Sequence, residues 1–194
     1  MTASSAIVPD VVTRARDRAR QLGFELSCED EVGALLASLA AAVPVGGRIV
    51  ELGTGAGVGL AWLVHGLGAR LDAEVVSVDV DRELQARVAN HGWPEYVRLV
   101  GGDGAEVVTG LAPVDLVFAD APGGKTEGLD RTLGALAPGG VLVVDDMDLS
   151  RHVDDGLAGA IAAVRDALVG HPDLAVAEIG YSSGVVVAPR RRAG

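Results

Sequence analysis

Two kinds of apolar pattern alternate along the chain. The first two segments, residues 10–22 and 28–42, have the helical kind, and in the second Val32, Leu36 and Leu39 recur on one helix face. Short apolar runs rich in β-forming residues then alternate with further helix-like segments, which predicts an α/β fold. The expected strands cover residues 48–52, 74–78, 97–100, 114–119 and 141–144, and the expected helices between them cover 57–67, 82–90, 105–110 and 126–136.

The expected strands are continuous apolar runs, and such strands separated by helices are typical of a parallel sheet that is buried on both faces. A last helix is expected over residues 154–169, and two closing strands over 175–179 and 184–188. The turn between those strands is short enough for a hairpin, so an antiparallel pair should end the sheet.

Length and composition agree with a single domain. The chain has 194 residues, of which 49% are hydrophobic and only 3% aromatic. A chain of this length can bury most of the surface that its unfolded form exposes, and its core must be aliphatic. We expect one domain over residues 1–194, in which N-terminal helices within 1–45 pack on an α/β core formed by 46–194.

Charge narrows the class of partner. The formal net charge is −11, whereas sequence-independent binding to nucleic acid depends on clustered Lys and Arg. Nucleic acid is therefore not an expected partner. Two basic clusters depart from the acidic balance, and we interpret them as a solvated helix face and a frayed tail. They consist of Arg14, Arg16, Arg18 and Arg20, and of Arg190, Arg191 and Arg192.

The compartment expected from the sequence is the cytoplasm. Cys28 is the only cysteine, so no internal disulfide can form, and the acids beside it should make its thiol hard to ionise. The longest uncharged stretch, residues 32–47, contains Pro44 and two glycines and is too short to span a bilayer. Residues 1–9 carry no Lys or Arg, unlike the start of a signal peptide.

A glycine-rich turn, in the run RIVELGTGAGVGLAWL, follows the strand expected over 48–52. Glycines at 53, 55, 57 and 59 let the backbone turn sharply and let a ligand approach the main chain. No register of this turn supplies the Gly-x-Gly-x-x-Gly of a dinucleotide loop, and the Gly-Lys-Ser/Thr of a phosphate loop is absent too. Glu51 would repel a pyrophosphate, but it suits a positively charged ligand.

Acidic residues follow the next two strands as well. Asp79 stands about twenty residues after the turn, the position from which a carboxylate accepts hydrogen bonds from ribose hydroxyls. Asp81 should cap the following helix, whereas Asp103 and its neighbours could border an adenine ring. The expected ligand is therefore a nucleoside that has no phosphates and carries a cationic centre, and S-adenosylmethionine is such a molecule.

These runs together resemble a known family. ELGTGAGVG, SVDVD, GGDGAE, DLVFADAPGGK and GGVLVVDDM, at their spacings, resemble the class I S-adenosylmethionine-dependent methyltransferases, and more narrowly the small O-methyltransferases related to catechol and caffeoyl-coenzyme A O-methyltransferases. The resemblance covers nearly the whole chain. It implies a Rossmann-like fold with helices on both faces of a mostly parallel seven-stranded sheet, in the order 3-2-1-4-5-7-6, with a C-terminal antiparallel hairpin.

The resemblance also implies the activity, which is transfer of a methyl group from S-adenosylmethionine to a hydroxyl of a small, catechol-like molecule. The acceptor itself stays open, because the loops that would line its pocket, around 122–128 and 147–154, are short and carry no aromatic residue. Such a pocket is either open and permissive or completed by a second subunit of a homodimer. The residues expected to bind the cofactor are Glu51, Gly53, Thr54, Gly55, Gly57, Asp79, Val80, Asp103, Gly104 and Asp120.

Members of the resembled family hold a divalent metal at two strand ends. The matching residues here are Asp120 and Asp145, while Asp146 stands where the family usually has Asn. This set keeps oxygen ligands suited to Mg²⁺, which would orient an acceptor hydroxyl and lower its pKa. Lys125 matches a lysine near the acceptor, but it lies two places further along than in the family. Asp120, Lys125 and Asp145 are therefore the expected catalytic residues.

Alternatives remain for these features. The carboxylates could only cap the turns that follow them, as Asp148 is expected to do near Ser150. His152 is interpreted as a surface residue rather than as part of the acceptor pocket. The chain could also methylate tRNA or another macromolecule, for which the cluster around Arg14 and Arg18 is the sole support. It could finally bind the nucleoside without catalysis, as the displaced Lys and the missing Asn would allow.

Overall fold

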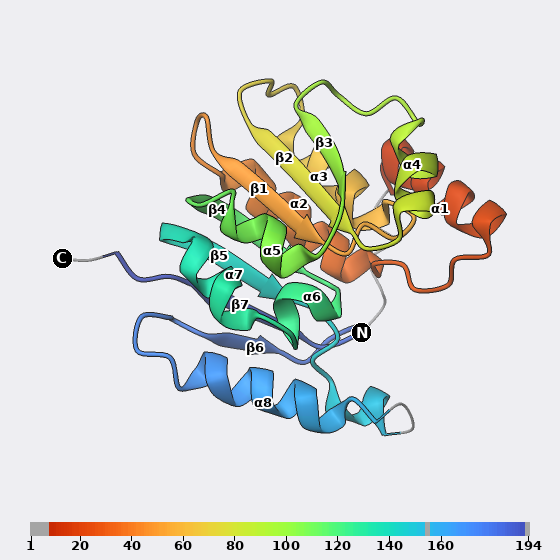
Figure 1. Ribbon diagram of the computed structural model, residues 1–194. Coiled ribbons are helices and arrows are strands. Elements are labelled where there is room, and N and C mark those ends of the chain that lie inside the picture. Colours follow the sequence, from red (N-terminus) through yellow and green to blue (C-terminus); the bar gives the residue numbers. More distant parts are fainter. Residues whose placement is uncertain (1–7, 154–155, 193–194) are drawn as a thin grey trace.

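The computed structural model describes residues 8–153 and 156–192, and its centre is a seven-stranded sheet (Figure 1). The strand order is β3-β2-β1-β4-β5-β7-β6, as the resemblance implies. The first five strands along the chain are parallel, and β7 runs antiparallel to both β5 and β6. The strands are β1 Arg48–Leu52, β2 Glu74–Asp79, β3 Val97–Gly101, β4 Val114–Ala119, β5 Leu136–Val144, β6 Ala177–Ile179 and β7 Val185–Pro189.

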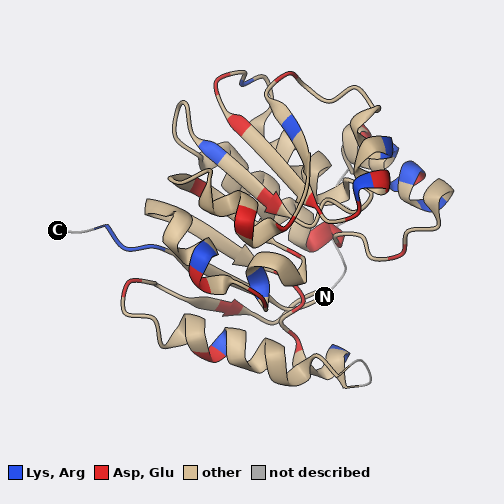
Figure 2. Ribbon diagram, in the orientation of Figure 1, with Lys and Arg blue, Asp and Glu red and all other residues tan. Residues whose placement is uncertain are grey.

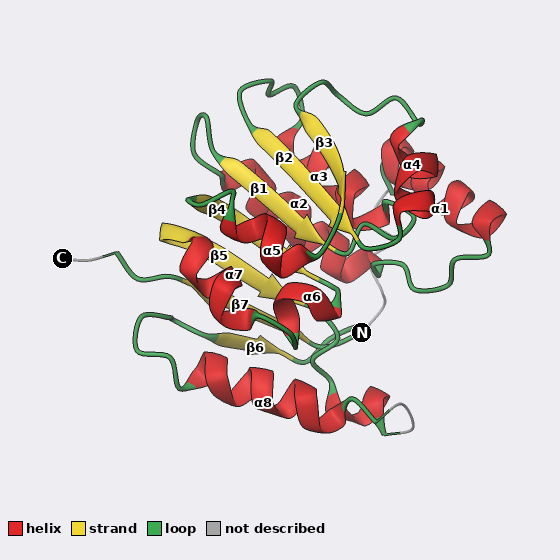
Figure 3. Cartoon of the chain, in the orientation of Figure 1, coloured by secondary structure: helices red, strands yellow, loops and turns green. Residues whose placement is uncertain are grey.

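Helices lie on both faces of the sheet and alternate with the parallel strands (Figure 3). Among the described residues, no helix is long and apolar enough to cross a membrane. The helices are α1 Asp10–Leu22, α2 Asp30–Ala42, α3 Val58–Leu67, α4 Arg82–Ala89, α5 Gly104–Thr109, α6 Pro122–Lys125, α7 Leu129–Ala135, α8 Ala158–Val169 and the 3₁₀ helix η1 Leu149–His152.

The helix expected over 154–169 begins at Ala158, with residues 154 and 155 outside the described part of the chain, and the strand expected over 175–179 begins at Ala177. The largest difference from the expected structure lies before and within β5. The helix expected over 126–136 begins only at Leu129, because Gly128 adopts a left-handed conformation with φ of 79°. Strand β5 then starts at Leu136 instead of 141, with Leu136 opposite Val114 and a register shift before the next pair. The Pro-Gly-Gly run inside β5 has the composition of a turn, but its glycines are held in the strand by backbone hydrogen bonds with Arg190.

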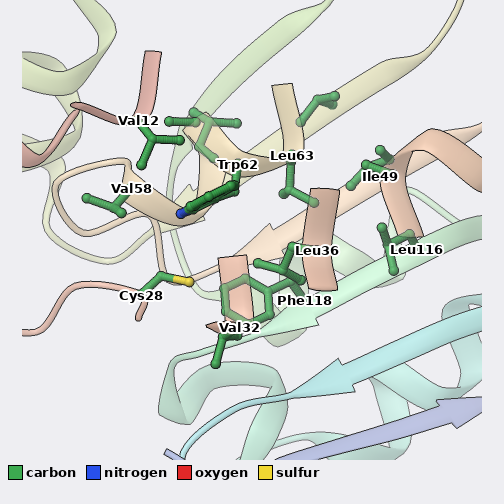
Figure 4. Close-up of a cluster of buried hydrophobic side chains, with 14 of the residues drawn as sticks. Val12, Cys28, Val32, Leu36, Ile49, Val58, Trp62, Leu63, Leu116 and Phe118 are labelled. Atoms are coloured by element: carbon green, nitrogen blue, oxygen red, sulfur yellow. The ribbon is translucent and has the colours of Figure 1, made fainter. Parts of the chain in front are cut away.

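The core has two parts, one on each face of the sheet. Neighbouring strand residues point to opposite faces, so Ile49 and Phe118 belong to one part and Val50 and Val117 to the other. Helices α1, α2 and α3 cover the first part (Figure 4), and α5, α7 and α8 cover the second. Burial of each large aliphatic side chain contributes about 1.5–3 kcal/mol to the stability of the folded state. Packing on both faces of the sheet therefore stabilises the strands and their ends.

The closest helix packing joins α2 to α3. A Cβ on Gly33 of α2 would lie 2.1 Å from the Trp62 indole nitrogen of α3, and a Cβ on Gly66 would lie 2.2 Å from the Ala37 backbone oxygen. Only residues without a side chain fit at such contacts. The pair of glycines therefore lets the two helices approach each other and seals the face of the sheet that α1 also covers.

The two arginine clusters are solvated as expected except for one residue in each: Arg14, Arg20, Arg191 and Arg192 are exposed, whereas Arg18 and Arg190 are held against the backbone. Arg18 is only 6% exposed, and its Nε donates to the Ala56 backbone oxygen at 2.7 Å. Its guanidinium also lies over the Trp93 ring, 5.3 Å from the centroid. Arg190 donates to the Leu136 backbone oxygen at 2.7 Å. Both corrections arise because a guanidinium carries several N–H donors and can hydrogen-bond a backbone carbonyl oxygen as well as face solvent.

Candidate active site

The site lies where three neighbouring parallel strands end. Leu52 of β1 is paired with Ala119 of β4, and Ala119 is paired with Val144 of β5. The pattern continues one residue further, since Asp120 donates its N–H to Leu52 at 2.9 Å and Asp145 donates its N–H to Ala119 at 3.2 Å. The residues that follow the three strands therefore lie side by side at one edge of the sheet, where open α/β sheets bind their ligands.

The glycine-rich turn is held against this edge. Gly53 has φ of 104° and Gly55 has φ of 48°, both in the region that favours glycine. A Cβ on Gly53 would lie 2.8 Å from the Asp120 backbone oxygen, and one on Gly55 would lie 2.6 Å from the Phe24 ring. Gly57, with φ of 80°, precedes the first residue of α3. The turn thus presents bare backbone between β1 and β4.

Asp79, at the end of β2, fixes the turn from the other side. One of its carboxylate oxygens accepts the Gly55 N–H at 2.8 Å, and the other accepts the Asp81 N–H at 2.9 Å. Because a carboxylate has about four acceptor positions, Asp79 can still accept hydrogen bonds from two hydroxyls of a ligand. Val80 beside it is 73% exposed and could cover the flat side of a bound ring. Asp81 caps α4, as expected.

Asp103 and Gly104 lie beyond β3 and face the loop after β4. Asp103 is exposed and caps α5, because its carboxylate accepts the Glu106 N–H at 3.0 Å. A Cβ on Gly104 would lie 2.6 Å from the Gly123 backbone oxygen. The predicted adenine border therefore also has a structural role, since it holds α5 and the loop before α6 together.

Glu51 is not at the surface of the turn but directly beneath it. It is 1% exposed, and its carboxyl group accepts a hydrogen bond from Ser77. The Ser77 hydroxyl lies 2.5 Å from that of Thr54, which is also buried. Burial raises the pKa of Glu51 to about 8, and the negative charge of Asp79 adds to the rise. Glu51 and Thr54 thus support the turn through a buried hydrogen-bond chain.

Asp120 is the least satisfied carboxylate of the site. It is largely buried, and among the described residues no donor makes a hydrogen bond to its side chain. Burial raises its pKa well above the usual range, the charges of Asp145 and Asp146 raise it further, and Lys125 opposes the rise. Asp120 is therefore free to accept a hydrogen bond from a ligand.

Asp145 is satisfied from within the protein. Its Oδ1 accepts a hydrogen bond from Ser183 and the Asp146 N–H at 2.8 Å. Burial raises the pKa of Asp145, and the Ser183 hydrogen bond opposes this rise. Asp146 follows in the left-handed region, with φ of 55°, and its side chain is 42% exposed. Its backbone oxygen pairs with His152 at 2.8 Å.

Lys125 ends α6 and points into the same cluster. The residue is only 6% exposed. Its Nζ donates to the Asp145 backbone oxygen at 3.2 Å and lies 4.0 Å from Asp146 Oδ2. Gly123 and Gly124, inside this short helix, have non-helical backbone angles and kink the chain just before Lys125. Figure 2 shows the acidic residues of these strand-end loops in red and the basic residues in blue.

Several residues near the cluster carry no local signal in the sequence. Cys28, before α2, is buried, and its thiol has a raised pKa because of burial and then the charges of Asp120 and Asp145. The raised pKa agrees with a thiol that is hard to ionise, although burial outweighs the adjacent acids that suggested it. Glu29 accepts hydrogen bonds from Ser182, in the closing hairpin, and from Arg151. The start of α2 therefore covers the strand ends.

His152 corrects a second expectation. It was expected at the surface, but it is only 8% exposed and belongs to η1. The cause is its hydrogen bond to the Asp146 backbone, which draws the ring under the loop after β5. Asp148 caps η1 by accepting the Ser150 N–H at 2.9 Å, as expected.

The donor set does not fit a divalent ion in this arrangement. The described residues contain no group of three Asp, Glu, His or Cys side chains that could hold a metal ion. Asp145 uses one oxygen for Ser183 and for the Asp146 N–H, and the Lys125 ammonium lies next to Asp146. Mg²⁺ demands about six oxygen ligands in near-octahedral order. The magnesium site expected at Asp120, Asp145 and Asp146 stays a prediction.

Comparison with known proteins places the chain in a family. The profile of a family described as "Methyltransferase domain" matches residues 50–147, which include all three strand ends of the site. A protein of Mycolicibacterium vanbaalenii named "Putative O-methyltransferase" is 36% identical over 195 residues, covering 93% of this chain and 84% of that protein. The chain therefore belongs to the methyltransferase-domain family, which confirms the resemblance seen in its motifs.

Solved structures confirm the fold. The O-methyltransferase TomG from Streptomyces achromogenes, in complex with S-adenosylmethionine, has a TM-score of 0.80 at 24% identity and covers 98% of this chain and 93% of its own. An O-methyltransferase from Bacillus cereus, in complex with S-adenosylhomocysteine, has a TM-score of 0.79 at 18% identity, with coverages of 96% and 94%. Both share the Rossmann-like methyltransferase architecture with this chain.

Proposed function

We propose that this protein is an S-adenosylmethionine-dependent O-methyltransferase that acts on a small hydroxylated molecule. Membership of the methyltransferase family supports the class of enzyme. The name of the mycobacterial relative and the ligand in the TomG structure support the transfer to oxygen and the cofactor. The observation that carries the proposal is the contact of Gly53 with Asp120, which joins the cofactor turn to the acidic cluster.

The residues of the turn fit the cofactor by chemistry. Gly53 and Gly55 allow the sharp turn that brings the backbone to the strand ends, and Asp79 keeps acceptor capacity for the two ribose hydroxyls. Val80 and Asp103 border the adenine, with Gly104 behind them. No lysine or arginine stands in the turn to bind a phosphate, which agrees with a nucleoside that has none.

The acidic cluster fits the acceptor. S-Adenosylmethionine supplies an electrophilic methyl group on a sulfonium centre. Asp120 accepts the hydrogen bond of the acceptor hydroxyl and takes up its proton as the oxygen gains the methyl group, and the Lys125 ammonium faces the oxygen as its negative charge grows. Holding the reacting groups in line at contact distance can contribute about 7–11 kcal/mol in well-oriented model reactions. Asp145 acts mainly by holding Lys125, through its backbone oxygen.

Calorimetry with S-adenosylhomocysteine tests the cofactor part. Wild type should bind the nucleoside saturably, and Asp79→Asn should weaken binding by about tenfold or more, because a charged acceptor to the ribose contributes roughly 1.5–3 kcal/mol. Asp166→Asn, whose side chain is 77% exposed on α8, is the matched control and should bind like wild type. If wild type does not bind S-adenosylhomocysteine, the proposed function is wrong.

A transfer assay tests the acceptor part. Transfer of a labelled methyl group from S-adenosylmethionine to catechols, phenols and aliphatic alcohols would identify the class of acceptor. Product should form with at least one small hydroxylated compound and fall to background with Asp120→Asn. Methylation confined to tRNA would overturn the small-molecule acceptor and leave the cofactor assignment intact.

A further inference from the structure

We infer that Lys125 is the built-in cation of the acceptor site and takes the place of a divalent metal ion among Asp120, Asp145 and Asp146. The inference rests on the proposed function, since it assigns the acceptor to this cluster. The inference is drawn from the position of one side chain, which is more than nine-tenths buried in the protein.

Lys125 is unusual in the chain as well as in the fold. The chain has 16 Lys and Arg residues, and Lys125 is the only lysine among them. Every other permanent cation is an arginine, whose planar guanidinium is larger and more weakly hydrated than an ammonium. A compact point charge with three donors is the side chain that most resembles a metal ion in size and charge density. The one lysine stands where such a charge is needed.

The contacts of Lys125 are those of a cation in a ring of acidic groups. Its Nζ donates to the Asp145 backbone oxygen at 3.2 Å and lies 4.0 Å from Asp146 Oδ2. The ammonium therefore lies against two of the three residues that the resemblance assigns to a metal.

A metal ion would compete with Lys125 for the same oxygens. An ion bound to Asp146 Oδ2 at about 2.1 Å would sit within roughly 6 Å of the ammonium, and the two positive charges would repel each other inside a largely buried site. Asp145 offers a metal only its Oδ2, because Oδ1 already accepts hydrogen bonds from Ser183 and from the Asp146 N–H. The ammonium and the ion are alternatives rather than neighbours.

The proposed role of Lys125 explains two differences between this chain and the family pattern. Lys125 lies two places further along than the family lysine, and Asp146 replaces the family asparagine. The longer Gly-Gly loop lets the ammonium reach the cluster, and the second carboxylate, unlike an amide, gives it an ionic partner. Each change without the other would leave a charge uncompensated. Together they exchange a metal ion for a side chain.

The class of acceptor follows from this exchange. A metal ion binds two neighbouring oxygens of a catechol, whereas an ammonium needs only one oxygen to donate to. We expect the protein to methylate molecules with a single hydroxyl as well as vicinal diols. Methyl transfer should also proceed in EDTA at its full rate.

Binding of Mn²⁺, followed by loss of the free-ion electron paramagnetic resonance signal, tests the inference without an acceptor. With S-adenosylhomocysteine present, wild type and the matched control Arg131→Met, which removes an exposed cation of α7, should leave the signal unchanged. The double variant Lys125→Met, Asp146→Asn restores the family donor set. It should bind one Mn²⁺ at least about tenfold tighter than wild type, the scale of effect seen when groups around a metal are changed.

Saturable Mn²⁺ binding to wild type that is lost in Asp120→Asn would overturn the inference, and so would a folded double variant that binds no better than wild type. If the double variant does not fold, Mn²⁺ binding to the wild-type protein alone tests the inference. Lysine labelled with ¹⁵N at Nζ gives one signal from this chain, and that signal should persist when Mn²⁺ is added. Paramagnetic loss of the signal would place the metal beside Lys125 and overturn the inference. Failure of S-adenosylhomocysteine to bind would be a separate result, against the proposed function.

Discussion

Gly53 lies so close to Asp120 that a Cβ on the glycine would stand 2.8 Å from the aspartate backbone oxygen. This contact joins the turn after β1 to the end of β4, and it places the predicted cofactor loop beside the predicted acceptor site. The relationship is one of backbone to backbone, so neither residue can move without the other.

Gly53→Ala should therefore damage both stability and cofactor binding. The added methyl group meets rigid backbone at a positive φ, and we expect a loss of roughly 1–3 kcal/mol in the free energy of unfolding. Urea denaturation and calorimetry with S-adenosylhomocysteine measure the two effects. Gly134→Ala in α7 is the control, because a Cβ there meets nothing within 4 Å. Equal behaviour of the two variants would contradict the role of the contact.

Glu51→Gln should change how stability depends on pH in the absence of cofactor. Folded Glu51 keeps its proton up to a pKa of about 8, whereas in the unfolded chain it loses the proton near its ordinary value of 4.5. Between these values the folded state binds more protons, so this contribution falls as pH rises and is lost above 8.

The glutamine variant lacks this contribution because it stays neutral in both states. Its stability relative to wild type should therefore increase from pH 5 to pH 8, by at most about 1.4 kcal/mol per pH unit. Urea denaturation at several pH values measures the difference. A constant difference between the two proteins would mean that Glu51 is ionised in the folded protein.

Ser183→Ala should slow methyl transfer while leaving cofactor binding unchanged. The Ser183 hydroxyl donates to Asp145, whose backbone oxygen in turn holds Lys125. Loss of a donor to a buried carboxylate costs roughly 1–3 kcal/mol, which corresponds to a fall of about tenfold or more in kcat if the site loosens accordingly. Ser38→Ala removes an exposed hydroxyl of α2 and should leave kcat as in wild type. A Ser183→Ala variant with unchanged kcat would show that this support is not needed.

Gly33→Ala should destabilise the packing of α2 on α3. A Cβ on Gly33 would lie 2.1 Å from the Trp62 indole nitrogen, so the helices must separate, at a cost of roughly 1–3 kcal/mol. Thermal unfolding measures the loss. Gly159→Ala in α8, where a Cβ meets nothing within 4 Å, should be neutral or slightly stabilising. The idea fails if both variants melt at the same temperature.

The strands and the turn could be predicted because their signals are local. The apolar runs at 48–52 and 114–119 match β1 and β4 residue for residue, and the helix at 10–22 matches α1. The start of β5 could not be predicted, because Pro138 and the glycines after it oppose a strand locally. The pairing of Leu136 with Val114 and the backbone hydrogen bonds of Gly139 and Gly140 with Arg190 hold that segment in the sheet.

The sequence by itself determined the α/β fold, the glycine turn and the acids at the strand ends, since the alternation of patterns and the order of the chain specify all three. Tertiary structure alone decided which charges are buried and what they contact. Ser183 donates to Asp145 across 38 positions, and Ser182 to Glu29 across 153. Arg18 and Lys125 look like surface cations in the sequence, yet the fold buries both. The reason is physical, because the environment of a charge depends on segments that meet only after the sheet has formed.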